Sequence, residues 1–184
     1  PDARLPWLKM MNVTEIESIS SKESQAVEFT PIEGSQRFRF TPCAVAATDE
    51  VDAWGKTLQM VENGLDLIVI EADGVESLDC SLKSNDKINI LSERADRLVI
   101  SIAADVNGWL SIADTWYPGW KASIDGMDGI LYRANYAFRG IRIPAGNHTV
   151  VIHYQPDWWL PAVLASMAGL LMLIIILVLG RKSV

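Results

Sequence analysis

The residues best suited to contact a ligand are aromatic and basic, and they gather between Trp109 and Tyr136. The run DTWYPGWK, residues 114–121, places aromatic rings on both sides of Pro118-Gly119. Proline presets φ and glycine permits positive φ, so this pair predicts a type II turn that presents the flanking rings. Such rings can stack on sugar faces, contact protein or lipid, or fill the core of the domain. The candidate glycan or protein contacts are Trp116, Tyr117, Trp120, Lys121, Arg133, Tyr136 and Arg139.

The sequence has no motif for catalysis, cofactor binding or metal binding. It contains no Gly-rich phosphate loop, no Gly-x-Ser-x-Gly segment and no His-Glu-x-x-His segment. The odd spacing of His148 and His153 on a predicted strand points them to opposite faces. The run DGMDG at 125–129 lacks the spacing of a calcium loop and predicts a hairpin turn. We therefore expect no catalytic residue, no cofactor and no metal site in this chain.

The two cysteines, Cys43 and Cys80, exclude a disulfide-dense scaffold and a four-cysteine zinc site. A disulfide between them would close a loop of about 38 residues and stabilise the fold by about 4 kcal/mol. Two separately buried thiols are the alternative, and the sequence leaves both open.

The C-terminal end predicts a membrane anchor. No charged residue occurs from Trp158 to Gly180, and these 23 residues form a Leu/Ile-rich stretch. As a helix they would reach about 34 Å, enough to cross a hydrocarbon core of about 30 Å. The alternative of a buried core helix fits less well with a position at the chain end. The interface residues are Trp158, Trp159, Arg181 and Lys182, and the small residues for helix packing are Ser166 and Gly169.

Charge predicts the orientation of this anchor. Basic residues stay on the cytoplasmic side, so residues 181–184 form a cytoplasmic tail and the N-terminal domain lies outside. The chain carries a net charge of −7, and residues 1–157 alone carry −9, which argues against a nucleic-acid partner. The sequence begins at Pro1, so export implies a removed signal peptide, a missing upstream part or a sequence that starts after the true N-terminus.

Residues 1–80 predict a small α+β region. Val51, Trp54, Leu58 and Val61 recur at helical spacing, with Thr48 or Asp49 as the cap and Asn63-Gly64 as the end. The other elements expected here are a helical turn at Pro6–Met11 and strands at Val13–Ile19, Ala26–Thr30, Arg37–Phe40 and Leu65–Glu71.

Residues 81–157 predict an antiparallel β-sandwich or jelly roll, because short strands alternate with turn residues. The expected strands are Lys87–Leu91, Arg97–Ala104, Trp109–Thr115, Lys121–Ile124, Ile130–Tyr132, Phe138–Ile143 and Thr149–Tyr154. The whole chain is thus expected to be mainly β, with the sandwich followed by one transmembrane helix over 158–180.

The segment GWLSIADTWYPGWKASIDG at Gly108–Gly126, continuing through Tyr132–Arg139 and Ile143–Val150, resembles the C-terminal part of YfhO-type bacterial membrane proteins. Leu8–Ile16 looks like the segment before the first strand of that part, and Thr41–Ala47 like its proline-containing strand. YfhO-type proteins look like polytopic glycosyltransferases that use a polyprenyl-phosphate sugar outside the cytoplasm. The resemblance implies a tail domain outside the bacterial inner membrane. It does not imply catalysis, because the family's acidic residues lie in loops between transmembrane helices that this sequence lacks.

These features predict a non-catalytic, single-span subunit whose exported β-domain serves as a scaffold or accessory module in a larger membrane complex. The alternative is a C-terminal fragment or split subunit of a YfhO-type glycosyltransferase, with the β-domain contacting a glycan acceptor. The expected partners are membrane lipid and other membrane-protein subunits, with glycan under the alternative and no nucleic acid.

Overall fold

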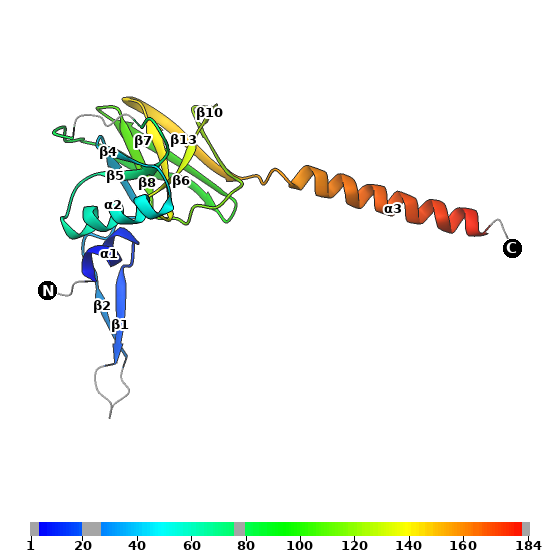
Figure 1. Cartoon of the computed structure of the whole chain (residues 1–184), viewed down its shortest axis with the longest axis horizontal. Helices are drawn as coiled ribbons and strands as arrows, with labels where there is room; N and C mark the ends of the chain where they lie inside the picture. Colours follow the sequence, from blue (N-terminus) through cyan, green and yellow to red (C-terminus); the bar gives the residue numbers. More distant parts are fainter. Residues whose placement is uncertain (1–3, 20–26, 76–79, 182–184) are drawn as a thin grey trace.

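The computed structural model describes residues 4–19, 27–75 and 80–181, and its main body is a β-sandwich (Figure 1). The six-stranded sheet contains, in spatial order, β3 (Phe38–Thr41), β8 (Gly108–Ile112), β12 (Phe138–Ile143), β11 (Leu131–Ala134), β5 (Ile68–Glu71) and β4 (Ala44–Ala47). The five-stranded sheet contains β10 (Met127–Gly129), β9 (Trp120–Ile124), β13 (Gly146–Tyr154), β7 (Arg97–Ala104) and β6 (Lys87–Arg94). The mainly β fold class predicted from the sequence is therefore confirmed.

The core lies between the two sheets, where alternating side chains meet. In β7 the buried residues Leu98, Ile100 and Ile102 alternate with half-buried ones, as expected for a strand with one face inward. Leu110 and Ile112 of β8 belong to the same buried cluster from the opposite sheet. Each such side chain contributes about 1.5–3 kcal/mol when fully buried, so this layer is a main source of stability.

The six-stranded sheet takes strands from both sides of the expected boundary at residue 80. β3 pairs with β8, and β5 pairs with β11, so residues 38–71 are part of the sandwich. β4 and β5 are parallel, and the helix α2 (Glu50–Glu62) makes the crossover between them that a parallel pair requires. A disulfide joins Cys43, before β4, to Cys80, before β6.

The helix α2 begins and ends where the sequence predicts, but its buried face differs. Asp49 caps the helix by accepting a hydrogen bond from the Asp52 N–H at 2.9 Å. Of the four residues in the expected stripe, Val61 is buried and Leu58 is half-buried, but Val51 is 80% exposed and Trp54 is 46% exposed. The residues that face the sheet are Ala53, Thr57, Met60 and Val61. Ala53 and Thr57 have small side chains, which let the helix approach β4 and β5 closely, and a search for large apolar residues does not find these two positions.

Before the sandwich come a short helix and a hairpin. The helix α1 (Leu5–Met10) packs on α2 through stacked Trp7 and Trp54 rings, whose centroids lie 5.4 Å apart. The strands β1 (Glu15–Ile19) and β2 (Val27–Pro31) pair antiparallel, and their hairpin projects from the body (Figure 1). Both strands were expected, although Ala26, the first residue of the second expected strand, lies outside the described residues.

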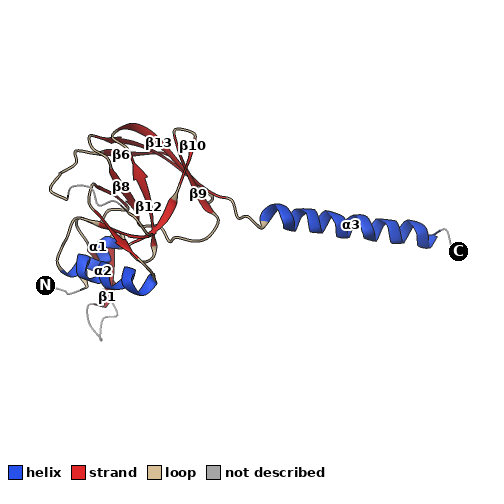
Figure 2. Cartoon of the chain, turned by 45° about the horizontal axis from the view of Figure 1, so that its top comes forward, coloured by secondary structure: helices blue, strands red, loops and turns tan. Residues whose placement is uncertain are grey.

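The last helix, α3 (Trp159–Arg181), extends away from the sandwich, while α1 and α2 lie at the other side of it (Figures 1 and 2). Its segment Trp159–Leu177 has a mean hydropathy of 2.6, and none of the most apolar part is buried against the rest of the chain. This helix is long and apolar enough to cross a membrane.

Candidate functional site

The turn in the aromatic segment forms around Pro118 and Gly119. The Trp120 N–H donates to the Tyr117 carbonyl at 3.3 Å, and Gly119 has φ +102°. The two rings that flank this turn have different surroundings. Tyr117 is 61% exposed, whereas Trp120 packs against the core between the sheets. Of the two, Tyr117 is therefore the ring that remains open to solvent.

Trp120 contacts a buried arginine and a second ring. The guanidinium carbon of Arg139 lies 3.8 Å from the centroid of the indole ring, which is the geometry of a cation–π contact. The Tyr154 ring lies 5.4 Å from it, centroid to centroid. The Arg139 contact uses a ring face that a sugar would otherwise stack on, so Trp120 matches the core alternative stated above.

The contacts of Trp120 continue into a row of rings and guanidinium groups. Arg139 lies opposite Arg133 in the pairing of β12 with β11, so the two arginines are neighbours. Arg133 lies 5.3 Å from the centroid of the Tyr136 ring, and Trp54 meets Tyr136 edge-on at 5.1 Å. We call this set the aromatic–arginine row, and its members are Tyr154, Trp120, Arg139, Arg133, Tyr136, Trp54 and Trp7.

Like charges directly opposite each other on adjacent strands are destabilising. Each arginine of the row has an acidic partner that offsets this repulsion. Arg133 lies 3.3 Å from Glu50 and 3.5 Å from Glu71, and its Nε donates to the Tyr136 carbonyl at 2.6 Å. Arg139 lies 3.5 Å from Asp114. Burial lowers the pKa of Arg139, because the charged form loses water, and the charge of Asp114 opposes this shift.

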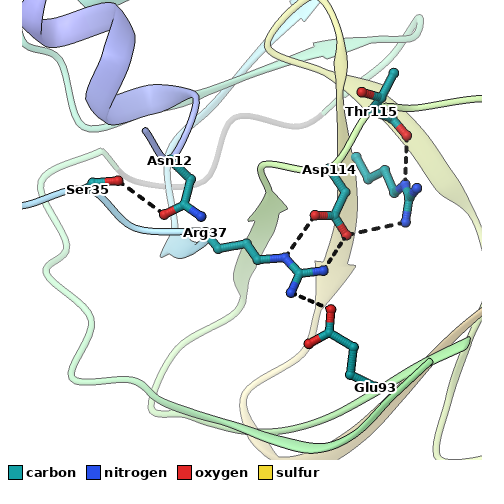
Figure 3. Close-up of polar contacts among 7 residues, drawn as sticks. Asn12, Ser35, Arg37, Glu93, Asp114 and Thr115 are labelled. Atoms are coloured by element: carbon teal, nitrogen blue, oxygen red, sulfur yellow. Dashed lines mark hydrogen bonds and ion pairs between the residues drawn. The ribbon is translucent and has the colours of Figure 1, made fainter. Parts of the chain in front are cut away.

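Asp114 also binds a second arginine (Figure 3). Arg37 donates from Nε and Nη2 to the two carboxylate oxygens of Asp114 at 2.8 and 2.9 Å, and from Nη1 to Glu93 at 2.7 Å. These hydrogen bonds, those to Asp114 first, raise the pKa of Arg37. Arg139 Nε donates to the Thr115 carbonyl at 3.0 Å. The network therefore ties β12 and the residue just before β3 to the segment after β8.

Four of the seven predicted contact residues belong to the row, and three do not. Trp116 is half-buried, and its N–H donates to the Ala137 carbonyl at 2.8 Å. Lys121 is exposed and pairs with Asp157 at 2.8 Å. Sequence reasoning missed Trp7, Trp54 and Tyr154, since they lie in elements distant along the chain and no spacing rule connects them.

The aromatic turn also contacts the segment that leads to α3. The Gln155 N–H donates to the Gly119 carbonyl at 2.7 Å. A side chain at Gly119 would place its Cβ 2.9 Å from Tyr154 and 3.1 Å from the Cα of Pro156. With the pairing of Lys121 and Asp157, these contacts hold residues 154–157 against β9. The aromatic segment thus contacts the residues that come just before the apolar helix.

The candidate membrane residues lie on and beside α3. Trp158 and Trp159 are exposed where the helix begins, and Arg181 is its last residue. Ser166 donates from Oγ to the Ala162 carbonyl at 2.8 Å. Apart from the helix's own backbone and adjacent residues, no atom of the described chain lies within 4 Å of the position that a Cβ on Gly169 would take. Lys182 and the rest of the expected tail, 183–184, lie outside the described residues.

The two histidines make separate contacts. His148 Nδ1 lies 2.6 Å from Asp125 Oδ2, and the hydrogen bond to Asp125 is the main reason why the pKa of His148 is raised. The Asp125-Gly126 pair, with φ of +52° and +81°, forms the predicted tight turn between β9 and β10. His153 Nε2 lies 3.4 Å from Gln155. In the part of the chain that the structure describes, no three His, Cys, Asp or Glu side chains group to hold a metal ion.

No family model, curated protein or solved structure matches this chain. The class that fold and site define is a β-sandwich with a C-terminal helix able to span a membrane.

Proposed function

We propose that the chain is a non-catalytic, single-span accessory subunit of a larger membrane complex. The observation that carries this proposal is α3, which is apolar and unburied over the length that a bilayer requires. A helix that is apolar on all sides and makes no packing contact with its own domain is suited to lipid and to other membrane helices. The sandwich then acts as a scaffold at the membrane surface.

The proposed location is the extracytoplasmic side of the bacterial inner membrane, with the C-terminus in the cytoplasm. Its support is the basic pair Arg181 and Lys182 at one end of the helix and the tryptophans Trp158 and Trp159 at the other. The contacts of Gly119 and Lys121 with residues 155–157 would keep the sandwich close to the outer surface.

The helix face that we propose for partner contact contains Ser166 and Gly169. These residues are three apart and share one side of α3, where small side chains permit close approach. Leu164 and Leu171 lie on the opposite side, since the helix advances about 100° per residue. Both leucines are exposed in the isolated chain, so they serve as matched controls.

Photocrosslinking in native membranes tests the proposal. The two natural cysteines are bonded to each other, so single cysteines at 164, 166, 169 and 171 can each be labelled with a benzophenone maleimide. We expect a discrete product of higher mass from S166C and G169C and weaker yields from L164C and L171C. Equal yields at all four positions, together with a monodisperse monomer that co-purifies with nothing in mild detergent, would contradict the proposal.

The aromatic–arginine row favours a second candidate, in which the chain is a C-terminal fragment or split subunit of a YfhO-type glycosyltransferase. In that case the β-domain contacts a glycan acceptor. Two exposed rings are available for sugar stacking, Trp54 in the row and Tyr117 outside it. Tryptophan fluorescence of the full chain, titrated with an oligosaccharide, tests this candidate. The response should be lost in Trp54→Leu and kept in Trp158→Leu, and no response in the unaltered chain would exclude it.

A further inference from the structure

A pocket of about 350 Å³ lies between α1, the C-terminal end of α2 and the outer face of β3 and β8. Its lining includes three basic side chains, Lys9, Arg37 and Arg39, and one acidic side chain, Asp66. Met10 and Leu65 add apolar surface beside these charges. The volume is in the range of pockets that hold small molecules.

The guanidinium group of Arg39 lies in the pocket wall and contacts no carboxylate of the described residues. It donates from Nη2 to the Leu67 carbonyl and lies 3.9 Å from the sulfur of Met60. In the described ranges no carboxylate oxygen lies within 4.0 Å of the Arg39 guanidinium, so Arg39 forms no ion pair there. The charge of Asp66 acts on Arg39 from further away. Burial lowers the pKa of Arg39. A guanidinium has five N–H donors, so most of its hydrogen-bonding capacity remains for a ligand.

Lys9 provides a second positive charge on the same pocket. Its Nζ lies 3.6 Å from the position that a Cβ on Gly34 would occupy, and no ion pair joins it to another described residue. Arg37, by contrast, is neutralised by Asp114 and Glu93. Among the residues that line the pocket, the two unpaired cations Lys9 and Arg39 are therefore accompanied by a single acidic side chain, Asp66. The domain as a whole carries a negative charge.

We propose that this pocket binds a small ligand that carries a carboxylate or phosphate group, held by Arg39 and Lys9. The planar guanidinium fork matches the two oxygens of such a group, and the ammonium adds a point charge. The apolar lining accepts the body of the ligand. This inference does not depend on the membrane function proposed above, because it rests on the opposite side of the sandwich from α3.

Calorimetric titration of the full chain in detergent at low salt tests the inference with three probes: inorganic phosphate, glucuronate and neutral glucose. We expect saturable binding of at least one of the two anions with a Kd of about 1 mM or tighter. Binding of phosphate alone assigns a phosphate group, binding of glucuronate alone assigns a carboxylate, and binding of both assigns either oxyanion. Saturation by neither anion, or glucose binding as tightly as glucuronate, would overturn the proposal.

Three variants identify the cations. Arg39→Gln and Lys9→Gln should each weaken binding by about tenfold or more, the effect of losing one charge-assisted hydrogen bond. Lys83→Gln removes an exposed charge outside the pocket and should leave the affinity unchanged. Circular dichroism checks folding, and Lys9→Gln carries the test by itself if loss of the Arg39–Leu67 hydrogen bond unfolds the chain. Equal affinity in Lys9→Gln and Lys83→Gln would overturn the assignment.

Discussion

Replacing Gly119 by alanine tests whether the aromatic turn holds the segment before the membrane helix. Two costs are expected. At φ +102° an L side chain is strained, which costs about 1–2 kcal/mol for residues with positive φ. The new Cβ would also lie 2.9 Å from a Tyr154 ring carbon and 3.1 Å from Pro156 Cα. Overpacking of this kind costs about 1–3 kcal/mol.

Relief of the second cost is difficult, because the neighbours are fixed. Pro156 presents backbone, and the Tyr154 ring is held at 5.4 Å from the Trp120 ring. Summed, Gly119→Ala should lower the free energy of unfolding by about 2–5 kcal/mol. The matched control is Gly126→Ala, where φ is +81° but no atom lies within 4 Å of the added Cβ. This control should lose only the conformational part, about 1–2 kcal/mol.

The measurement is unfolding of the full chain in detergent, followed by tryptophan fluorescence against urea concentration and against temperature. For a domain of this size about 1 kcal/mol corresponds to 2–4 °C, so Gly119→Ala should unfold roughly 2 to 12 °C below Gly126→Ala. Equal losses in the two variants would refute the reasoning, since they would show that residues 154–156 do not pack against Gly119 closely enough to exclude a side chain.

Two further predictions concern the disulfide and a histidine. Replacing both Cys43 and Cys80 by alanine should lower the free energy of unfolding by about 4 kcal/mol, measured by urea titration, because the bridge restricts the unfolded chain; reductant should destabilise the natural chain similarly and leave the variant unchanged. The stability that His148→Gln loses should depend on pH. The hydrogen bond to Asp125 raises the pKa of His148. The hydrogen bond from the Thr149 N–H, and after it the one from His148, lower the pKa of Asp125. The difference from the natural chain should be largest near pH 5.5, shrink as the pH rises through the raised pKa above about 6.5, and shrink again in acid below about 3.8. A difference that stays constant from pH 5 to 9 would contradict this assignment.

Strand positions could be predicted from local pattern where one face is buried. Alternation in Arg97–Ala104 predicted β7, and the spacing of short strands and turns predicted β12 at Phe138–Ile143, both with the ends that the structure has. The same reasoning placed the caps of α2 but not its buried face. Ala53 and Thr57 are buried because the helix crosses closely over β4 and β5, and that proximity depends on a strand pairing that local sequence does not encode.

The candidate site was less predictable, because its contacts cross the chain. The pairing of Arg133 with Arg139 follows from strand register, and the contact of Trp54 with Tyr136 follows from how α2 lies on the sheet. The alternation of Arg37 and Arg39 with Phe38 and Phe40 does carry a signal for the pocket. In a strand, two arginines at i and i+2 share one face, opposite the face that buries the phenylalanine rings.

The geometry of Asp114 bears on whether the aromatic segment could be catalytic. A general acid or base must reach a substrate proton with one of its carboxylate oxygens. Both oxygens of Asp114 accept hydrogen bonds from Arg37, and one of them also lies 3.5 Å from Arg139. The two guanidinium groups therefore occupy the positions from which the carboxylate would act. The acidic residue of the aromatic motif therefore serves as a counter-ion that joins Arg37, just before β3, to Arg139 in β12. This supports a structural role for the segment and agrees with the proposal of a non-catalytic subunit.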